Sequence, residues 1–222
     1  MPLFSKCQAY SCYIKGNCSM GASQSLLTKA DTLRDKVNEA YSAAATHPEQ
    51  KHPFPIGRKL AENLGYPSEV LDGVPPSSVE AFAGISNVSL FADLPAGATV
   101  LDLGCGAGMD SIIAARRVGP KGRVIGIDFS EAMLVRARAA KELVNLPHLQ
   151  FQQGDAEYLP LADKSMDVVL VNGIFNLNPK RKEVLSELAR VLRPRGRAYV
   201  AELILTKPLP EADHANESNW FA

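Results

Sequence analysis

Three aspartates stand at or just beyond short apolar segments, and their positions suggest the chemistry of the chain. Asp102 lies two residues before Gly104 in a glycine-rich run, Asp128 closes the segment RVIGID, and Asp155 follows LQFQQ. A carboxylate at the end of a strand can accept hydrogen bonds from both hydroxyls of a ribose. An acid beside a glycine loop favours a ligand with a cationic amino group over a phosphate. The pattern therefore indicates a ligand that carries both a ribose and a cationic amino group.

The glycine run narrows the class of ligand further. Gly104, Gly106 and Gly108 permit positive φ angles and let a ligand approach the backbone closely. A dinucleotide fingerprint G-x-G-x-x-G would need a glycine at position 109, where the chain has Met109. The sequence also lacks the triphosphate loop G-x-x-x-x-G-K-S/T. Both observations disfavour a nicotinamide dehydrogenase and a nucleoside triphosphatase.

Alternating strands and helices must position these residues. Short apolar segments predict five strands, over 99–104, 123–128, 149–153, 167–172 and 198–205. Helices are expected between them over 110–118, 131–146 and 179–192, with Ser130 and Asn178 as N-caps. This alternation predicts an α/β fold with a doubly wound, mostly parallel sheet. Such sheets bind ligands at the carboxyl ends of their strands where the strand order reverses, which is where the three aspartates fall.

The chain before this core has no strand pattern. Residues 26–95 are predicted to form a helical cap, which begins with a helix from Leu26 to about Ala45 and continues in short helical pieces. Residues 1–25 are expected to be a loose tail, and residues 96–222 to form the ligand-binding core.

Composition excludes several function classes. Lys and Arg total 24, as do Asp and Glu, and this balance disfavours a sequence-independent nucleic-acid binder. No apolar run approaches the roughly 20 residues that a bilayer needs, so we expect no membrane span. Cys7, Cys12 and Cys18 have no metal-ligand spacing, so they are predicted to be free thiols, and no metal site is expected. The composition predicts a soluble, cytoplasmic protein.

Four segments together carry a family resemblance. VLDLGCGAG, VIGIDFSEAML, GDAEYLPL and DVVLVNGIFNL, in this order and spacing, resemble the successive motifs of class I S-adenosylmethionine-dependent methyltransferases. The resemblance covers roughly residues 97–205 and implies a Rossmann-like methyltransferase fold with S-adenosylmethionine as cofactor and a small-molecule methyl acceptor as partner.

The resemblance also implies roles for individual residues. Asp102 and the backbone of Gly104, Cys105, Gly106 and Gly108 would hold the methionine part of the cofactor. Asp128 would bind the ribose hydroxyls, and Asp155 with the Ala156 amide would read the adenine. Phe129 and Met133 would flank the adenine, and Asn172 would face the methyl group and the acceptor.

The acceptor is left open by the sequence. NGIFNLNPKRKEVLSELARVLRPRGRAYVAE is similar to the arsenite methyltransferase branch, which holds arsenic with cysteine thiolates because a soft ion prefers soft sulfur. That branch's paired cysteines have no counterpart in residues 42–57, and Gly173 stands where the branch has cysteine. Cys105 is interpreted as a small packing residue. Alternative functions are a thiol, amine or hydroxyl methyltransferase of a natural-product pathway, or a cofactor-binding protein without turnover.

No catalytic residue is assigned from the sequence. An amine or hydroxyl acceptor would need a general base, and the candidates are His47, His52, His214 and Glu202. Each of these is interpreted as a surface or capping residue.

The C-terminal end carries a further expectation. The class closes its sheet with an antiparallel hairpin after the fifth strand, and residues 206–222 are too few for a helix and two strands. We therefore expect a chain in which these C-terminal strands are missing. The fifth strand would then be an exposed sheet edge, through which the chain could self-associate.

Overall fold

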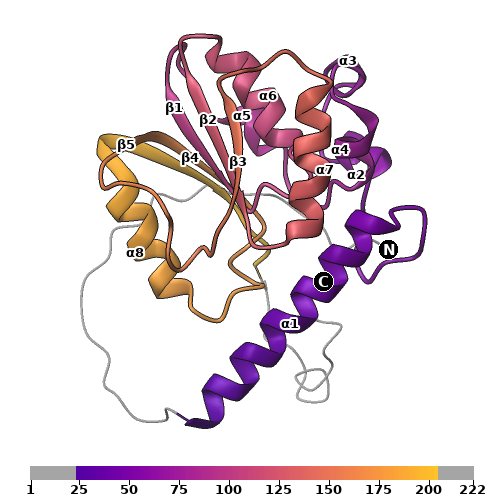
Figure 1. The fold of residues 1–222 in the computed structure, drawn as a ribbon, viewed down its shortest axis with the longest axis vertical. Coiled ribbons are helices and arrows are strands. Elements are labelled where there is room, and N and C mark those ends of the chain that lie inside the picture. The colour runs from indigo at the N-terminus through magenta and orange to yellow at the C-terminus, as the bar shows by residue number, and fades with distance from the viewer. Residues whose placement is uncertain (1–23, 205–222) are drawn as a thin grey trace.

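A computed structural model describes residues 24–204 and contains one five-stranded sheet (Figure 1). Its strands are β1 (Thr99–Leu103), β2 (Arg123–Asp128), β3 (Leu149–Gln153), β4 (Met166–Asn172) and β5 (Leu192–Ala201). They lie in the order β3-β2-β1-β4-β5, and each neighbouring pair is parallel. The strand order reverses between β1 and β4, so the carboxyl ends of these two strands flank the switch point.

Helices cover both faces of the sheet, as the apolar strands predict. One face packs against α6 (Met109–Val118) and α7 (Glu131–Glu142), and the other against α8 (Arg181–Val191). Val100 of β1 joins the cluster under α6, whereas its neighbour Leu101 joins the cluster under α8. Successive strand residues therefore point into two separate cores, which makes the sheet doubly wound as predicted.

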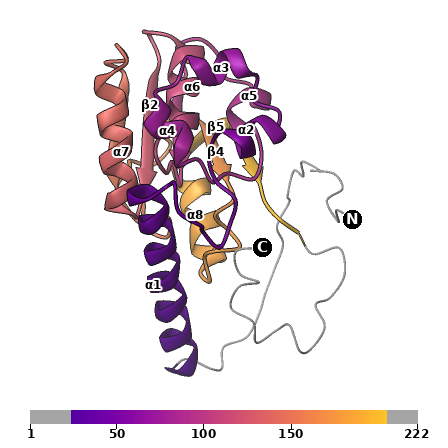
Figure 2. The ribbon, with the colours of Figure 1, turned by 90° about the vertical axis from the view of Figure 1, so that its right-hand side faces the viewer.

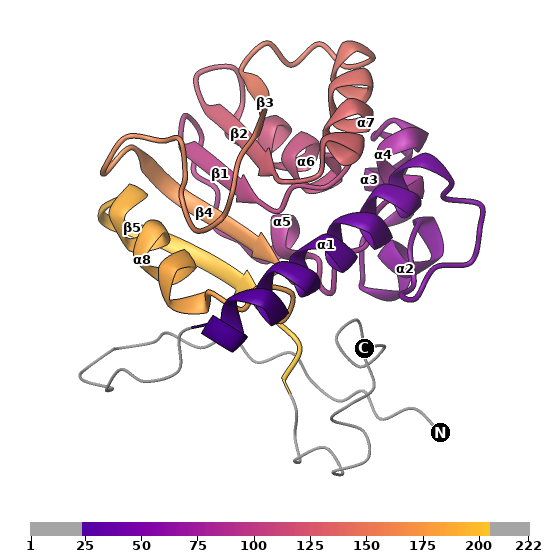
Figure 3. The ribbon, with the colours of Figure 1, turned by 60° about the horizontal axis from the view of Figure 1, so that its bottom comes forward.

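Five helices precede the sheet. They are α1 (Gln24–Thr46), α2 (Arg58–Asn63), α3 (Ser68–Asp72), α4 (Pro76–Glu80) and α5 (Val88–Phe91). The short helices α2 to α5 gather on the α6 side of the sheet, and α1 runs apart from them as one long rod (Figure 2). Seen from below, α1 crosses the carboxyl end of the sheet from the α7 side toward α8 (Figure 3).

Several boundaries differ from the prediction. Helix α8 begins at Arg181 because the Asn178 side chain accepts a hydrogen bond from Lys180 N over 2.7 Å, which forms a turn before the helix. Helix α7 ends at Glu142, four residues before the expected position of 146. The helices α3 and α5 have only five and four residues, too short for a periodic pattern to reveal them.

The fifth strand shows the largest shift. β5 starts at Leu192, whereas the sequence predicted a start at 198, and it ends at Ala201. Its pairing with β4 slips after the first residue pair, and Arg195 within the slip has a φ of 70°. Residues 193–196, which the sequence placed between a helix and a strand, therefore form an irregularity inside β5. Most of the predicted tail, with Cys7, Cys12 and Cys18, lies outside the described residues.

Among the helices that the structure describes, none has the length and apolar character needed to cross a membrane.

Candidate cofactor and acceptor site

A cavity opens at the switch point between β1 and β4, and all four loops that follow β1 to β4 contribute to its wall. Helix α1 adds Arg34, Val37 and Tyr41. Ten predicted site residues line this cavity: Asp102, Gly104, Cys105, Gly106, Asp128, Phe129, Met133, Asp155, Ala156 and Asn172. Gly108 does not. The topology thus brings together residues that are spread over seventy positions of the sequence.

Gly108 has a packing role in the structure. It caps α6 with a φ of 85°, and a Cβ atom there would lie 2.6 Å from the ring of Phe151 on β3. The absence of a side chain therefore lets α6 approach the sheet closely.

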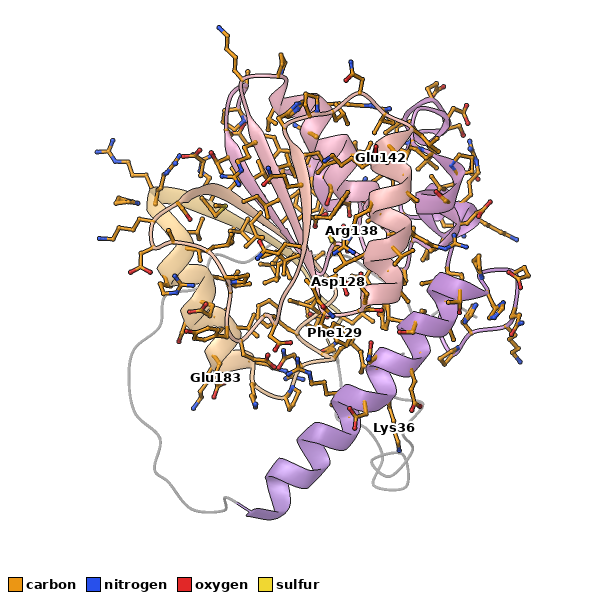
Figure 4. All side chains as sticks on the ribbon, in the orientation of Figure 1. Lys36, Asp128, Phe129, Arg138, Glu142 and Glu183 are labelled. Carbon is orange, nitrogen blue, oxygen red and sulfur yellow. The ribbon has the colours of Figure 1, made fainter. Side chains whose placement is uncertain are left out.

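Asp128 is held at the end of β2 by backbone groups. Its two carboxylate oxygens accept hydrogen bonds from Gly106 N over 2.8 Å and from Ser130 N over 2.9 Å. The side chain is buried, and burial raises the pKa of Asp128 above its ordinary value. Each oxygen has a second lone pair, so the carboxylate can still accept from ligand hydroxyls. Figure 4 shows Asp128 and Phe129 at the end of the sheet near α1.

Asp102 on β1 is still more enclosed, with 2% of its surface exposed. Ser111 of α6 donates a hydrogen bond to it over 2.5 Å. Burial, and then the neighbouring carboxyl of Asp110, raises the pKa of Asp102 to about 8. A cation placed beside this group would favour its ionised form, so the position suits a ligand ammonium.

Asp155 lies in the opening of the cavity after β3. Its side chain is 46% exposed and forms an ion pair with Arg34 of α1. Arg34 also approaches Glu157, with 3.6 Å between the guanidinium nitrogen and the carboxylate oxygen. The neighbouring Ala156 lines the same end of the cavity, and Met133 is buried in its floor.

Cys105 is a poor ligand for a metalloid. Its side chain is buried in the glycine-rich loop after β1, and burial followed by the charge of Asp128 raises the pKa of its thiol well above the usual value. The thiol therefore stays protonated at neutral pH, which agrees with a packing role. Among the residues that the structure describes, no cluster of three His, Cys, Asp or Glu side chains could hold a metal ion.

The sequence analysis missed Asp110, a buried carboxylate at the start of α6. It accepts hydrogen bonds from the Tyr66 hydroxyl over 2.5 Å, from the Ser89 hydroxyl, and from Asn172 Nδ2 over 2.9 Å. Burial raises the pKa of Asp110. An acid in a first helical turn is usually a solvated partner of the helix dipole, so only its tertiary contacts reveal this network.

Asn172 has its whole side-chain amide engaged by the protein. Besides its bond to Asp110, Nδ2 donates to Ser86 O over 2.8 Å, and Oδ1 accepts from Ile85 N and Ser86 N over 2.9 and 3.1 Å. The residue lines the cavity, but these bonds give it a clear structural task. Asn172 fixes the cap segment at 85–86 above the switch point.

Comparison with known proteins identifies the family of this site. A family model described as a methyltransferase domain matches residues 94–221, more than half of the chain. This chain belongs to the class I S-adenosylmethionine-dependent methyltransferases. The match begins just before β1, so it covers the sheet and all the residues that the motifs predicted.

Individual methyltransferases are similar to different extents. An arsenite methyltransferase of Halobacterium salinarum is 38% identical over 151 residues, which cover 68% of this chain and 38% of that protein. A demethylmenaquinone methyltransferase of Lactobacillus johnsonii is 43% identical over 109 residues, covering 48% of this chain and 44% of that protein. The chain thus spans less than half the length of either relative.

A solved structure of an arsenic methyltransferase is also similar to this chain. An arsenic(III) S-adenosylmethionine methyltransferase from Chlamydomonas reinhardtii matches with a TM-score of 0.56 and 30% identity. The match covers 76% of this chain and 58% of the other. The Rossmann-like methyltransferase fold predicted from the sequence is therefore confirmed.

The chemistry of the site fits the cofactor of this class. S-adenosylmethionine carries an ammonium group, ribose hydroxyls and an adenine amino group, and the cavity presents one aspartate at each of three successive strand ends. When ionised, the buried Asp102 and Asp128 offer only hydrogen-bond acceptors, and ligand donors and cations favour that ionised state. S-adenosylmethionine is the cofactor of this methyltransferase.

Proposed function

We propose that this methyltransferase transfers a methyl group from S-adenosylmethionine to a small, soft acceptor held between α1 and the loop after β4. The observation that carries the proposal is the convergence of Asp102, Asp128 and Asp155 on one cavity that has an apolar wall beside them. Val37, Tyr41, Phe82, Ile174 and Leu177 form that wall.

Within this proposal the aspartates divide the cofactor between them. Asp102, with the backbone of Gly104 to Gly106, holds the methionine ammonium, and Asp128 accepts the ribose hydroxyls. Asp155 and the amide of Ala156 bind the adenine edge between Phe129 and Met133. When bound, the cofactor supplies an electrophilic methyl group on a sulfonium. The protein's contribution is then alignment of the acceptor, which can lower a barrier by roughly 7–11 kcal/mol.

The cavity favours an acceptor that needs no general base. Of the three histidines in the described part of the chain, none lines the cavity. Glu202 is also occupied, since its carboxylate accepts hydrogen bonds from Phe175 N over 2.6 Å and from Leu203 N over 3.0 Å. A thiolate or a trivalent metalloid attacks without losing a proton in the reaction, whereas an amine or hydroxyl needs a base.

Arsenite is the first candidate acceptor, because the arsenite methyltransferases of Halobacterium and Chlamydomonas are similar to this chain. Arsenite needs thiolate ligands, and the protonated Cys105 does not offer one. We therefore propose that arsenite is presented as a complex with an external thiol or with the cysteines at 7, 12 and 18. The proposed place of action is the cytoplasm.

A reduced naphthoquinone is the second candidate. The similarity to a demethylmenaquinone methyltransferase and the apolar cavity wall favour it. Such an acceptor would pack on the apolar side chains and would require no thiolate, but it loses a proton on methylation and so would need a base other than the described histidines.

The deciding experiment measures S-adenosylhomocysteine formation with arsenite plus glutathione, with simple thiols and amines, and with a reduced demethylnaphthoquinone. Asp128→Ala is the inactive control. Turnover with arsenite or the quinol alone selects that acceptor. Tight S-adenosylhomocysteine binding without turnover on the whole panel would overturn the proposal in favour of a binding protein.

A further inference from the structure

Helix α1 is anchored to the rest of the molecule through its C-terminal half. In its C-terminal half, Ala44 and Ala45 are buried, and the Ser42 hydroxyl lies 3.1 Å from the hydroxyl of Ser130, the N-cap of α7. Arg136 of α7 donates a hydrogen bond to Ala45 O. Further toward the N-terminus, Arg34 forms ion pairs across the opening of the cavity. The contacts of Arg34 therefore determine how this part of α1 meets the cofactor site.

Arg34 connects α1 to two loops of the methyltransferase core. Its guanidinium pairs with Asp155 and lies 3.6 Å from a carboxylate oxygen of Glu157. The other oxygen of Glu157 accepts a hydrogen bond from Asn178 Nδ2 over 3.0 Å. Four residues from three separate segments thus form one network, and all four line the cavity.

The contact with Asp155 uses one carboxylate oxygen. Arg34 pairs with Oδ1, so Oδ2 is the oxygen that the pair leaves to other donors. A planar guanidinium fixes the plane of the carboxylate that it contacts, because its donors have a rigid geometry. Without Arg34, the 46% exposed side chain of Asp155 would be free to rotate into solvent.

We propose that Arg34 is a positioning residue of the cofactor site: it orients Asp155 so that the free oxygen accepts from the exocyclic amino group of adenine. The proposal rests on the proposed role of Asp155 and adds a residue outside the motifs of the sheet. It assigns part of the nucleobase selectivity of the methyltransferase to the cap helix. We expect Arg34 to have a moderate influence on adenine binding, because an ion pair between exposed side chains contributes little free energy on its own.

The experiment compares the binding of S-adenosylhomocysteine with that of S-inosylhomocysteine, which lacks the amino group, by calorimetry. The wild type should prefer the adenine compound. Arg34→Gln should reduce that preference about three- to tenfold, the range of a typical net hydrogen-bond contribution. Arg34→Lys should retain part of the preference, because the charge remains while the planar geometry is lost.

Two further variants separate this role from a structural one. Arg58→Gln is the matched control, since Arg58 pairs with Glu62 and Asp72 on the cap and does not line the cavity. It should bind both compounds as the wild type does. In an Asp155→Ala background, Arg34→Gln should cause no further loss of preference, because both changes remove the same contact.

The outcomes are distinct. If Asp155→Ala abolishes the preference and Arg34→Gln preserves it, Arg34 does not position the carboxylate and the inference is wrong. If Asp155→Ala also preserves it, the proposed adenine role of Asp155 fails first. If Arg34→Gln weakens both compounds equally and lowers the melting temperature, Arg34 is merely structural and the inference is again overturned.

Discussion

Asn172 donates a hydrogen bond to Asp110 over 2.9 Å and thereby joins the end of β4 to the first turn of α6. The same amide holds the backbone of Ile85 and Ser86. Asp110 in turn accepts from Tyr66, so a polar chain runs from the cap through a buried carboxylate to the switch point of the sheet. The cap and the cofactor site therefore share one buried network, and a change in it should be felt in both.

Replacing Asn172 tests this network. Asn172→Ala should lower the free energy of unfolding by about 1–3 kcal/mol, because Asp110 and two backbone amides lose a buried partner. Asn172→Asp should cost more at pH 8 than at pH 5, since two adjacent buried carboxyls cannot both ionise. Urea denaturation measures both. The control is Asn38→Ala, an exposed asparagine on α1 whose loss should leave the denaturation midpoint in place. An unchanged midpoint for Asn172→Ala would contradict the network.

Asp128 should dominate cofactor affinity. Asp128→Ala is expected to weaken S-adenosylhomocysteine at least tenfold, about 1.4 kcal/mol, because a preoriented acceptor for two ribose hydroxyls is lost. Calorimetry gives the dissociation constant, and Asp93→Ala serves as control because Asp93 pairs with Arg197 on the surface. Wild-type affinity in Asp128→Ala, or binding of NAD in place of S-adenosylhomocysteine, would refute the assigned ribose contact.

Cofactor binding should depend on pH through Asp102. Its pKa of about 8 means that the ligand-free protein holds a proton there at neutral pH, which an ammonium–carboxylate pair must release. Affinity for S-adenosylhomocysteine should therefore rise by up to about tenfold per pH unit below pH 8 and level off above it. Calorimetry in two buffers of different ionisation heat counts the released proton. Asp102→Asn should bind more weakly and without this slope; a flat profile for the wild type would contradict the assignment.

Asp102 should also make the stability of the ligand-free protein depend on pH, and this stability should fall as the pH rises, whereas cofactor affinity rises. Because the folded pKa of Asp102 is raised, the folded state binds more protons than the unfolded state between about pH 4 and pH 8. The contribution of Asp102 to stability is thus complete below pH 4 and is lost as the pH rises through 8. The free energy of unfolding of the ligand-free protein should therefore increase in Asp102→Asn, most clearly at alkaline pH.

The sequence predicted what depends on local pattern. Asp102, Asp128 and Asp155 follow apolar strands, and parallel strands bring their carboxyl ends to one edge whatever the details of packing. The glycine run and the N-cap Ser130 are likewise local, and Ser130 accepts from Met133 N in the structure. These features fix the fold and most of the cofactor cavity.

Local sequence patterns did not predict the contacts between residues that are far apart in the chain. Arg34 and Asp155 are 121 positions apart, and Tyr66 and Asp110 are 44 apart, so no spacing rule links either pair. Asn178 was predicted to be an N-cap, but its side chain closes a turn with Lys180, the residue just before α8 begins. For Arg34 and Tyr66, the packing of the cap on the sheet brings together partners that no local pattern predicts.

The cysteines outside the described residues give a further prediction. Changing Cys7, Cys12 and Cys18 together to Ser should leave the melting temperature and the affinity for S-adenosylhomocysteine unchanged, because their spacing matches no metal site. Differential scanning calorimetry and metal analysis check both statements. Loss of several degrees, or of co-purified zinc, would show a structural role. Loss of arsenite methylation alone would instead identify these thiols as the proposed acceptor ligands.

The last prediction concerns β5, which pairs with β4 on one side and forms the edge of the sheet in the described part of the chain. An edge strand presents unpaired N–H and C=O groups that can recruit another chain. The apolar Leu203 and Ile204 follow it, 36% and 69% exposed. Light scattering should therefore reveal self-association that increases with concentration, and Leu203→Lys with Ile204→Lys should shift the protein toward monomer because two charges oppose pairing at the edge. Leu185→Lys is the matched control, since Leu185 is an exposed leucine of α8, 42% accessible, and lies on a helix. A monomer at every concentration would refute the prediction, and an equal shift by Leu185→Lys would assign association to general surface hydrophobicity instead of the β5 edge.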